Sequence, residues 1–208
     1  MAGPLGERRV RLLGLTGGIA TGKSTAARFF LEAGARVVDA DALARRVVEA
    51  GRPALGEIRA TFGPGVLRPD GSLDREALGK LVFRDPEARG RLNAIVHPRV
   101  AEEAAREIDA HRARDPGALV VYDVPLLFEE GLEGRFDAVA VVYAPRGEQL
   151  RRLMARDGLA EEAARARLAA QMDIEEKARR ADFLLDNRGP AEELGRQVRE
   201  LVARLRGV

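Results

Sequence analysis

One stretch near the start of the chain constrains the fold more than any other part of the sequence. Residues 10–25 read VRLLGLTGGIATGKST. The run 10–15 is short and mostly apolar, which predicts a strand buried on both faces. Residues 17–24 then match a phosphate-binding pattern of Gly, four residues, Gly-Lys, and Ser or Thr. Because residues 25–30 continue as good helix, the strand, loop and helix that this pattern requires follow one another in order.

The residue types in this loop suit a polyphosphate. Glycines allow the backbone to bend so that successive N–H groups point inward, where side chains would obstruct the phosphates. Lys23 supplies a positive charge, the Ser24 hydroxyl can bind Mg²⁺, and the helix opening at Lys23 directs its positive dipole end at the same anion. Lysine is rare here, at Lys23, Lys80 and Lys177, so a chance match is disfavoured. We predict a nucleotide-phosphate site formed by Gly17, Gly18, Ile19, Ala20, Thr21, Gly22, Lys23, Ser24 and Thr25.

The composition excludes several classes of protein. At 208 residues the chain is long enough for one substantial core, and the absence of cysteine rules out disulfides, zinc–thiolate sites and cysteine nucleophiles. The 35 basic and 33 acidic residues nearly cancel, so the pI near 9.4 reflects the high pKa of arginine and does not indicate a basic surface. No apolar run approaches the ~18 residues of a membrane span, and the first residues lack a signal-peptide core. We expect a cytoplasmic protein that binds neither nucleic acid nor membrane.

Two aspartates follow the second predicted strand, residues 36–38. Carboxylates just past the end of a parallel strand lie at the sheet edge where ligands bind, which is also the edge of the phosphate loop. We expect Asp41 to be the chemical group and Asp39 to be structural or directed at a metal. The alternative is that one of the two caps the helix predicted over residues 42–50.

Residues 52–114 predict helices at about 53–63, 74–83, 86–97 and 100–114, with no convincing strand. Pro98 is expected to interrupt or kink the last pair. This helical insertion, about residues 42–116, is a natural place for an acceptor substrate. His97 either touches that acceptor or is a buried structural histidine at the kink.

The third predicted strand, residues 118–123, also ends in a carboxylate. Asp123 is either a carboxylate near magnesium, as phosphate-loop enzymes often have at a strand end, or an exposed strand-terminal aspartate. The apolar loop that follows includes Pro125, Leu126, Leu127 and Phe128. Core packing is favoured over ligand contact for Leu126, and the reverse is favoured for Phe128.

The last third of the chain predicts a strand at 137–143, a helix at 146–157, a charged helix at 160–180, a strand at 181–185 and a closing helix at 191–205. Arg152 and Arg156 are four residues apart and share a face. An arginine-rich segment, about residues 146–178, suits a lid that closes on phosphates, although many of its arginines are expected only to solvate the surface. We predict a single domain over residues 1–208, with a frayed start at residues 1–9.

Several motifs together resemble the dephospho-coenzyme A kinase family from Leu13 to about Gly189. Beyond the phosphate loop, the matching residues are Val38-Asp39-Ala40-Asp41, His97-Pro98, Pro125-Leu126-Leu127-Phe128-Glu129, Gln149, Arg152, Arg156-Asp157, Gln171, Ala181-Asp182, Asp186-Asn187 and Gly189. The loop departs from the family at Ala20 and Thr21, where Gly and Ser are frequent. Because both residues are small, we expect a slightly stiffer loop that still functions.

The resemblance implies a three-layer α/β/α P-loop kinase fold with about five parallel strands, a helical substrate-binding insertion and a small helical lid. It implies a transferase that uses ATP and Mg²⁺ to phosphorylate the ribose 3′-hydroxyl of dephospho-coenzyme A, giving coenzyme A and ADP. It makes Asp41 the base and Lys23, Arg152 and Arg156 the groups that neutralise charge. The implied acceptor contacts are Asp41, His97, Pro125, Leu126, Leu127 and Phe128, and Asp186 and Asn187 are placed near adenine by analogy with related nucleotide kinases.

Two rival classes remain open at this stage. The first is another small-molecule or nucleotide kinase of the same fold, of adenylate or shikimate type, although a large insertion beside an apolar loop suits a long acceptor better. The second is a nucleotide-switched binding protein; the chain lacks the Asn-Lys-x-Asp guanine motif and a basic stripe with interleaved aromatics. We expect a monomer or a weak homo-oligomer.

Overall fold

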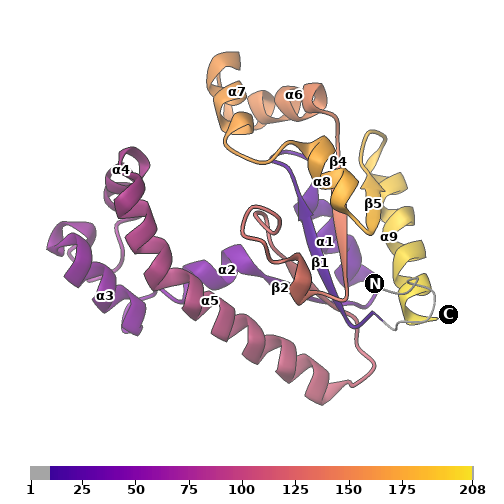
Figure 1. Ribbon diagram of the computed structural model, residues 1–208, viewed down its shortest axis with the longest axis horizontal. Coiled ribbons are helices and arrows are strands. Elements are labelled where there is room, and N and C mark those ends of the chain that lie inside the picture. Colours follow the sequence, from indigo (N-terminus) through magenta and orange to yellow (C-terminus); the bar gives the residue numbers. More distant parts are fainter. Residues whose placement is uncertain (1–9, 208) are drawn as a thin grey trace. The chain divides into compact units, whose positions relative to one another are not determined.

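The computed structural model describes residues 10–207, apart from the side chain of Arg84. Within that range five strands form one parallel sheet in the order β2-β3-β1-β4-β5 (Figure 1). Their bounds are β1 Leu12–Gly17, β2 Arg36–Asp39, β3 Val120–Asp123, β4 Ala138–Tyr143 and β5 Phe183–Asp186. The α/β fold with about five parallel strands is confirmed. The frayed start predicted for residues 1–9 lies outside the described residues.

The central strand β1 is buried because helices or loops cover both faces of the sheet. In register, Leu13 pairs with Val121 of β3 and with Ala138 of β4. Helices α1 (Lys23–Glu32) and α9 (Ala191–Arg206) pack side by side on one face (Figure 1). The core there contains Phe30 and Leu194. On the other face, a Cβ at Gly14 would lie 2.7 Å from Leu127, so glycine lets the loop after β3 pack directly against the strand.

The chain divides into two compact units, Met1–Val38 with His111–Val208, and Asp39–Ala110. The second unit is helical and has its own apolar core, which includes Ile58, Val66 and Leu78. Its elements are α2 (Ala40–Arg46), α3 (Pro53–Phe62), the 3₁₀ turn η1 (Pro64–Val66), α4 (Arg75–Arg84) and most of α5 (Pro86–Arg114). The helices predicted for this region are therefore present.

Helix α5 runs through Pro98 without a break, so the predicted interruption is wrong, and the alternative of a kink at Pro98 stays a prediction. Proline removes one backbone hydrogen bond and disfavours a helix interior. Apolar side chains on both sides of it, including Ile95, Val96 and Val100, pack against the same core. This packing holds the two halves in one helix.

The charged region after β4 forms three helices, α6 (Arg146–Asp157), α7 (Glu161–Ala169) and α8 (Ile174–Arg180). The single helix predicted for residues 160–180 is wrong, because Asp173 caps a new helix by accepting a hydrogen bond from the Glu175 N–H at 2.9 Å. A small core that contains Leu153 and Leu168 joins α6 and α7. The short 3₁₀ turn η2 (Glu133–Arg135) precedes β4. Among the described residues, no helix combines the length and apolar character that a membrane crossing requires.

Candidate active site

The phosphate loop joins β1 to α1 through a tight turn. The Thr21 N–H donates to the Gly18 carbonyl at 3.2 Å, and the Thr21 hydroxyl donates to the same oxygen at 2.9 Å. Two residues adopt left-handed backbone conformations, Gly22 at φ 93° and Ala20 at φ 60°. Alanine is strained in that region whereas glycine is not, so the departure from the family pattern at Ala20 carries a conformational cost.

Close contacts explain why the other loop positions are glycine. A Cβ at Gly17 would lie 2.6 Å from the Thr21 hydroxyl oxygen and 2.9 Å from the Val142 carbonyl oxygen. At Gly18 it would lie 2.9 Å from the Gln149 amide oxygen. At Gly22 it would lie 2.1 Å from the Asn187 amide nitrogen. Any side chain at these three positions would push the loop away from its supports.

Three polar side chains from other elements hold this loop. The Asn187 amide, at the end of β5, donates to the Thr21 carbonyl at 2.7 Å. Gln171, between α7 and α8, accepts a hydrogen bond from the Ile19 N–H at 2.8 Å. The buried Gln149 of α6 donates to the Ala144 carbonyl at 2.8 Å and packs on Gly18. Sequence reasoning placed Asn187 near adenine, and it gave no structural role to the two glutamines.

Lys23 forms an ion pair with Asp123 in which the ammonium nitrogen lies 2.5 Å from a carboxylate oxygen. Asp123 ends β3 and is 4% exposed, so the alternative of an exposed strand-terminal aspartate is wrong. Lys23 belongs to the first turn of α1, where no side chain of the described residues caps the N-terminus. The first N–H groups of that helix therefore have no capping side chain to compete with an anion.

The donor set at this edge fits a magnesium ion that is shared with a substrate. No group of three or more His, Cys, Asp or Glu side chains that could hold a metal occurs among residues 10–207. Mg²⁺ usually keeps several waters and binds through one or two carboxylates together with phosphate oxygens. The exposed Ser24 hydroxyl and the Asp123 carboxylate are a sparse set of this kind.

The two aspartates after β2 have different local roles. A carboxylate oxygen of Asp39 caps α2 by accepting hydrogen bonds from the N–H groups of Asp41 at 2.8 Å and Ala42 at 3.1 Å. The alternative in which one of the two aspartates caps the following helix is therefore confirmed for Asp39. Asp41 lies in the first turn of α2 and is exposed. Its side chain is therefore accessible to a ligand.

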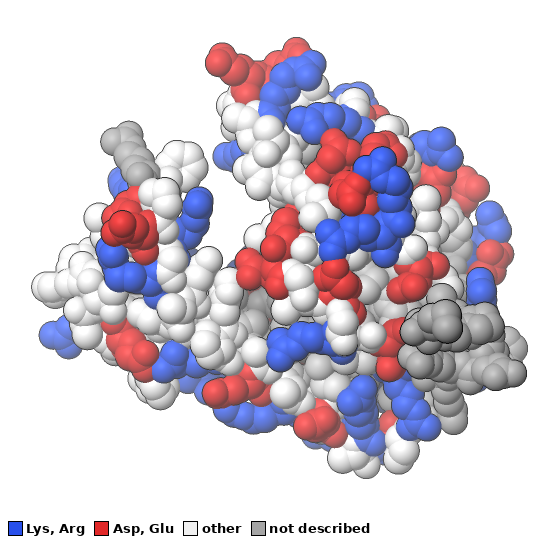
Figure 2. Space-filling view, viewed as in Figure 1, with Lys and Arg blue, Asp and Glu red and all other residues white. Residues whose placement is uncertain are grey.

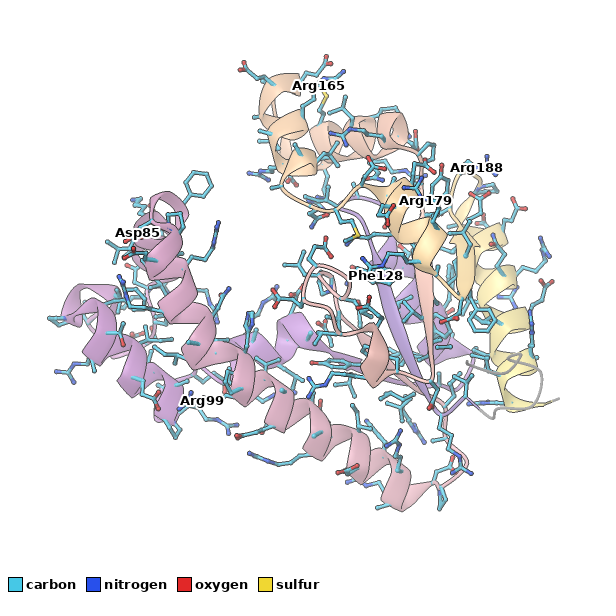
Figure 3. All side chains as sticks on the ribbon, viewed as in Figure 1. Asp85, Arg99, Phe128, Arg165, Arg179 and Arg188 are labelled. Carbon is cyan, nitrogen blue, oxygen red and sulfur yellow. The ribbon has the colours of Figure 1, made fainter. Side chains whose placement is uncertain are left out.

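The apolar loop after β3 is buried in the opposite order from the expected one. Phe128, which is labelled in Figure 3, is 4% exposed. The Arg180 guanidinium lies over its ring at 4.6 Å from the centroid, whereas Leu126 is 39% exposed. Leu127 is fully buried against the sheet at Gly14. Leu127 and Phe128 therefore anchor the loop, and Leu126 is left exposed.

His97 is exposed on α5, which contradicts the alternative of a buried structural histidine. Together with Asp39 and Asp41 it belongs to the helical unit, and the remaining predicted site residues belong to the other unit.

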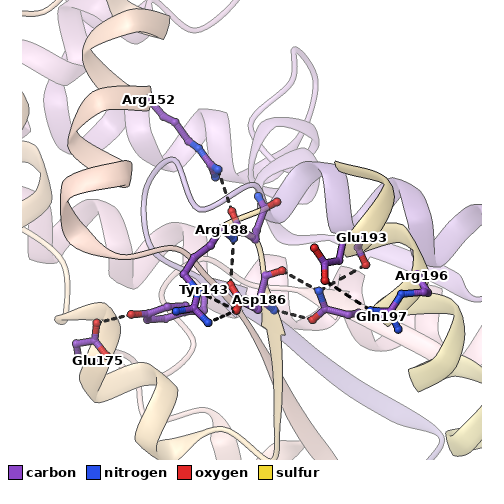
Figure 4. Close-up of polar contacts among 9 residues, drawn as sticks. Tyr143, Arg152, Glu175, Asp186, Arg188, Glu193, Arg196 and Gln197 are labelled. Carbon is purple, nitrogen blue, oxygen red and sulfur yellow. Dashed lines mark hydrogen bonds and ion pairs between the residues drawn. The ribbon is translucent and has the colours of Figure 1, made fainter. Parts of the chain in front are cut away.

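The arginines of α6 pair with nearby carboxylates. Arg152 donates to Glu148 at 2.7 Å and to the Asn187 carbonyl at 2.8 Å, so it joins α6 to the end of β5 (Figure 4). Arg156 donates to its neighbour Asp157 at 2.7 Å and is half exposed. The hydrogen bond from Arg156 is the main reason that the pKa of Asp157 is lowered. Arg156 is therefore close to solvent, where an anion can compete for it, whereas Arg152 is mostly buried between Glu148 and the Asn187 carbonyl.

Asp186 is held by neighbours, which sequence reasoning did not anticipate. Its backbone N–H and carbonyl bind the Gln197 amide, each at 2.8 Å (Figure 4). Its carboxylate pairs with Arg188, whose hydrogen bond is the main reason that the pKa of Asp186 is lowered. A cavity of about 330 Å³ is lined by Asp186, Arg188, Gly189, Glu193 and Gln197.

Lys177 of α8 is the main feature of this site that sequence reasoning missed. Its side chain is fully buried, although it is charged. In the sequence, Lys177 is simply one of several basic residues in a charged stretch. In the structure its neighbours Arg179 and Arg180 are more exposed than it is. Nothing in that stretch reveals the hydrogen-bond partners of Lys177, which come from distant parts of the sequence.

Charge on the molecular surface is mixed. Figure 2 shows Lys and Arg interspersed with Asp and Glu over the drawn face, with no continuous basic stripe there. A nucleic-acid-binding face would concentrate basic residues along one groove or stripe. The drawn face therefore gives the nucleic-acid alternative no support.

Comparison with known proteins agrees with the motifs. Residues 11–193 match the sequence model of a family described as Dephospho-CoA kinase. The dephospho-CoA kinase of Anaeromyxobacter dehalogenans (strain 2CP-C) is 58% identical over 198 residues, which cover 95% of this chain and 93% of that protein.

Two solved structures are also similar. The crystal structure of TT1252 from Thermus thermophilus has a TM-score of 0.80 and 41% identity, covering 94% of this chain and 98% of that one. A dephospho-CoA kinase from Campylobacter jejuni has a TM-score of 0.64 and 28% identity, covering 94% of this chain and 97% of that one. The sheet order, the phosphate loop and these matches lead to one conclusion: this chain belongs to the dephospho-CoA kinase family.

Proposed function

We propose that this chain transfers the γ-phosphoryl group of ATP to the ribose 3′-hydroxyl of dephospho-coenzyme A, giving coenzyme A and ADP. The observation that supports this most directly is the phosphate loop, which is bent, braced and followed by an uncapped helix N-terminus in a chain of this family. Phosphoryl transfer relies mainly on positioning and on charge neutralisation, and a preformed loop supplies both.

The donor end of the reaction is assigned to the phosphate loop and α1. The N–H groups of Ile19, Thr21 and Thr25 are already bonded within the protein, so the β- and γ-phosphates are assigned to the other backbone N–H groups of the loop. Lys23 neutralises charge on the transferring group. To reach the phosphates, Lys23 exchanges its partner Asp123 for a phosphate oxygen. Ser24 and Asp123 would hold Mg²⁺, which supplies further charge neutralisation when bound.

The acceptor end is assigned to the helical unit and the apolar loop. Asp41 orients the ribose hydroxyl and accepts its proton, since a ribose hydroxyl is a poor nucleophile at neutral pH. The cap contacts of Asp39 leave it less suited to this task. His97, Pro125, Leu126, Leu127 and Phe128 are assigned to the acceptor, with Leu126 the most available of the loop side chains.

The proposed function also includes a lid and an adenine site. The segment of residues 146–178 acts as a lid, whose Arg152 and Arg156 approach the phosphates, and Asp186 and Asn187 lie near adenine. Residues 1–208 act as one P-loop kinase domain with an acceptor-binding insertion at about 42–116. The enzyme works in the cytoplasm as a monomer or weak homo-oligomer.

A substrate panel tests this function. ADP release is measured with ATP, Mg²⁺ and each of dephospho-coenzyme A, AMP and shikimate. Of the three acceptors, only dephospho-coenzyme A is expected to give turnover. Phosphorylation at the 3′ position is checked by mass spectrometry and phosphorus NMR of the product. Faster turnover with AMP or shikimate would overturn the proposal in favour of another kinase of this fold.

Asp41→Asn tests the assigned base. The variant keeps the side-chain shape but cannot accept a proton, so kcat should fall by roughly two or more orders of magnitude while the affinity for ATP stays near normal. Asp39→Asn is the matched control, because an asparagine also caps helices and little loss of stability is expected. A loss of only a few-fold in the Asp41 variant would exclude Asp41 as the base.

A further inference from the structure

Lys177 places a buried ammonium group between two loops that carry different parts of the site. Its nitrogen lies 2.9 Å from a Glu129 carboxylate oxygen, 3.1 Å from the Pro125 carbonyl oxygen and 3.3 Å from the Gly17 carbonyl oxygen. These three acceptors match the three N–H donors of an ammonium group. Gly17 opens the phosphate loop and Pro125 opens the apolar loop, so one side chain ties both together.

Further hydrogen bonds connect the same two loops to the segment that contains Lys177. The Thr16 hydroxyl donates to the same Pro125 carbonyl at 3.0 Å. Glu129 also accepts a hydrogen bond from the Met172 N–H at 3.0 Å. The neighbouring Gln171 holds the Ile19 N–H of the phosphate loop. Residues 171–177 therefore contact both loops at several points.

The orientation of one peptide plane follows from this arrangement. In a planar trans peptide the carbonyl of one residue and the N–H of the next point in opposite directions. Because the Gly17 carbonyl is directed at Lys177, the Gly18 N–H is directed away from α8. The lysine thus fixes the first peptide plane of the phosphate loop.

A charged group is an expensive choice for this position. Burial lowers the pKa of the Lys177 ammonium, and the hydrogen bond to Glu129 opposes that change. Replacing a buried ion pair by apolar residues of similar volume is often neutral or stabilising. An ion pair with three directed donors is therefore better explained by geometry than by stability. The nearby charge of Lys23 also acts on Lys177, so the two cations lie in one electrostatic neighbourhood.

We propose that Lys177 is a positioning residue for phosphoryl transfer, which sets the phosphate loop and the apolar loop relative to each other by donating to the Gly17 and Pro125 carbonyls. Glu129 holds the ammonium group in place. This inference rests on the proposed function, because that function assigns the two loops to the donor and the acceptor. Lys177 acts through the backbone and does not need to touch either substrate.

Lys177→Met is the decisive variant, because methionine keeps the apolar stem and removes all three donors. Since loss of alignment on the scale of 1 Å can cost roughly 100-fold in rate, kcat should fall by about 10-fold to 100-fold. The KM for ATP should rise much less, because the loop N–H groups remain. The melting temperature should fall, because the Glu129 carboxylate and two carbonyl oxygens lose their donor, so kcat is measured at a temperature where the variant is folded. Lys177→Arg, which keeps a cation and its donors, should recover part of the lost kcat.

The control and the second variant keep the outcome unambiguous. Lys80→Met removes an exposed lysine that pairs only with Glu76 on its own helix among the described residues, and it should leave kcat and KM unchanged. If Lys177→Met does not fold, Glu129→Gln retains an oxygen acceptor but removes the countercharge, and should lower kcat several-fold in a folded protein.

Different results reject the proposed function and the positioning role of Lys177. Wild-type inactivity towards dephospho-coenzyme A in the substrate panel would reject the function, and with it the loop assignments on which the inference rests. An active wild type together with a folded Lys177→Met variant of unchanged kcat would reject the positioning role alone. A loss of activity in Lys177→Met that matches its unfolded fraction, with no recovery of kcat in Lys177→Arg, would also reject the positioning role.

Discussion

The phosphate loop and helix α6 both carry basic residues assigned to phosphate binding, but they are held by different kinds of contact. The loop is fixed by buried partners from distant segments, Asn187 on Thr21 and Lys177 on Gly17. On α6, Arg156 instead pairs with its sequence neighbour Asp157. Exposed pairs of this kind contribute little to stability, so exchanging a carboxylate for a phosphate costs little. Under the proposed function, the donor site is formed before ATP binds and Arg156 is recruited by it.

Lys23→Ala should have the largest effect, and it tests whether the phosphate loop is the preformed ATP site. Removing the ammonium group takes away charge that acts on the transferring phosphoryl group, so kcat should fall roughly 100-fold to 1,000-fold or more. It also leaves the Asp123 carboxylate buried without its lysine partner, which should lower the melting temperature. Steady-state kinetics and thermal unfolding measure both effects. Wild-type kinetics would contradict the assignment of this loop to ATP phosphates.

Arg156→Ala tests whether an exposed arginine of α6 is recruited to the phosphates. Its exposed pair with Asp157 contributes little to folding, so the melting temperature should change slightly while kcat falls by roughly ten-fold or more. Arg165→Ala is a matched control, because Arg165 pairs with Glu161 on α7 and points outward (Figure 3). A large loss of melting temperature with little change in kcat would make Arg156 structural.

Local signals were sufficient to predict much of this fold. Helix α6 begins after Pro145 and ends at Gly158 in a left-handed conformation, and its predicted bounds, residues 146–157, are confirmed. The phosphate loop was predictable because its glycines, lysine and serine follow a known spacing, although the contacts that require Gly18 and Gly22 come from the distant Gln149 and Asn187. In both cases the information lies in a short stretch of sequence.

Contacts between distant residues set the limits of prediction. The burial of Lys177 depends on Gly17 and Pro125, which are 160 and 52 positions away, and no periodicity within α8 encodes them. The burial of Phe128 involves Arg180, which lies over its ring and is distant from it in the sequence. The start of α8 was missed for a different reason, since Asp173 is a recognisable cap that the surrounding helix-forming residues concealed.

Ala20→Gly sharpens the comparison by removing strain from the preformed loop. Alanine at φ 60° costs about 1–2 kcal/mol, and glycine relieves this at the expense of about 0.5–1 kcal/mol of unfolded-state entropy. The free energy of unfolding should therefore rise by up to about 1 kcal/mol. Ala163→Gly in α7 should instead lower it by about 0.5–1 kcal/mol, because that position is helical and exposed. Urea unfolding of both variants measures the difference, and equal losses would show that Ala20 is not strained.

Glu148→Gln should have the smallest effect and tests how weakly α6 is held. Hydrogen bonds from Arg151 and Arg152, opposed by desolvation, lower the pKa of Glu148 from its ordinary 4.5 to about 2. A carboxyl group with a lowered pKa in the folded state stabilises the fold above the unfolded pKa and loses that contribution as the pH falls through the folded one. The wild type should therefore melt slightly above the variant at pH 5–7, and the gap should close between pH 4.5 and about 2. High salt should narrow the gap at neutral pH, because exposed pairs are screened. A gap that persists unchanged at pH 2 would mean that packing of the side chain, and not its charge, holds α6.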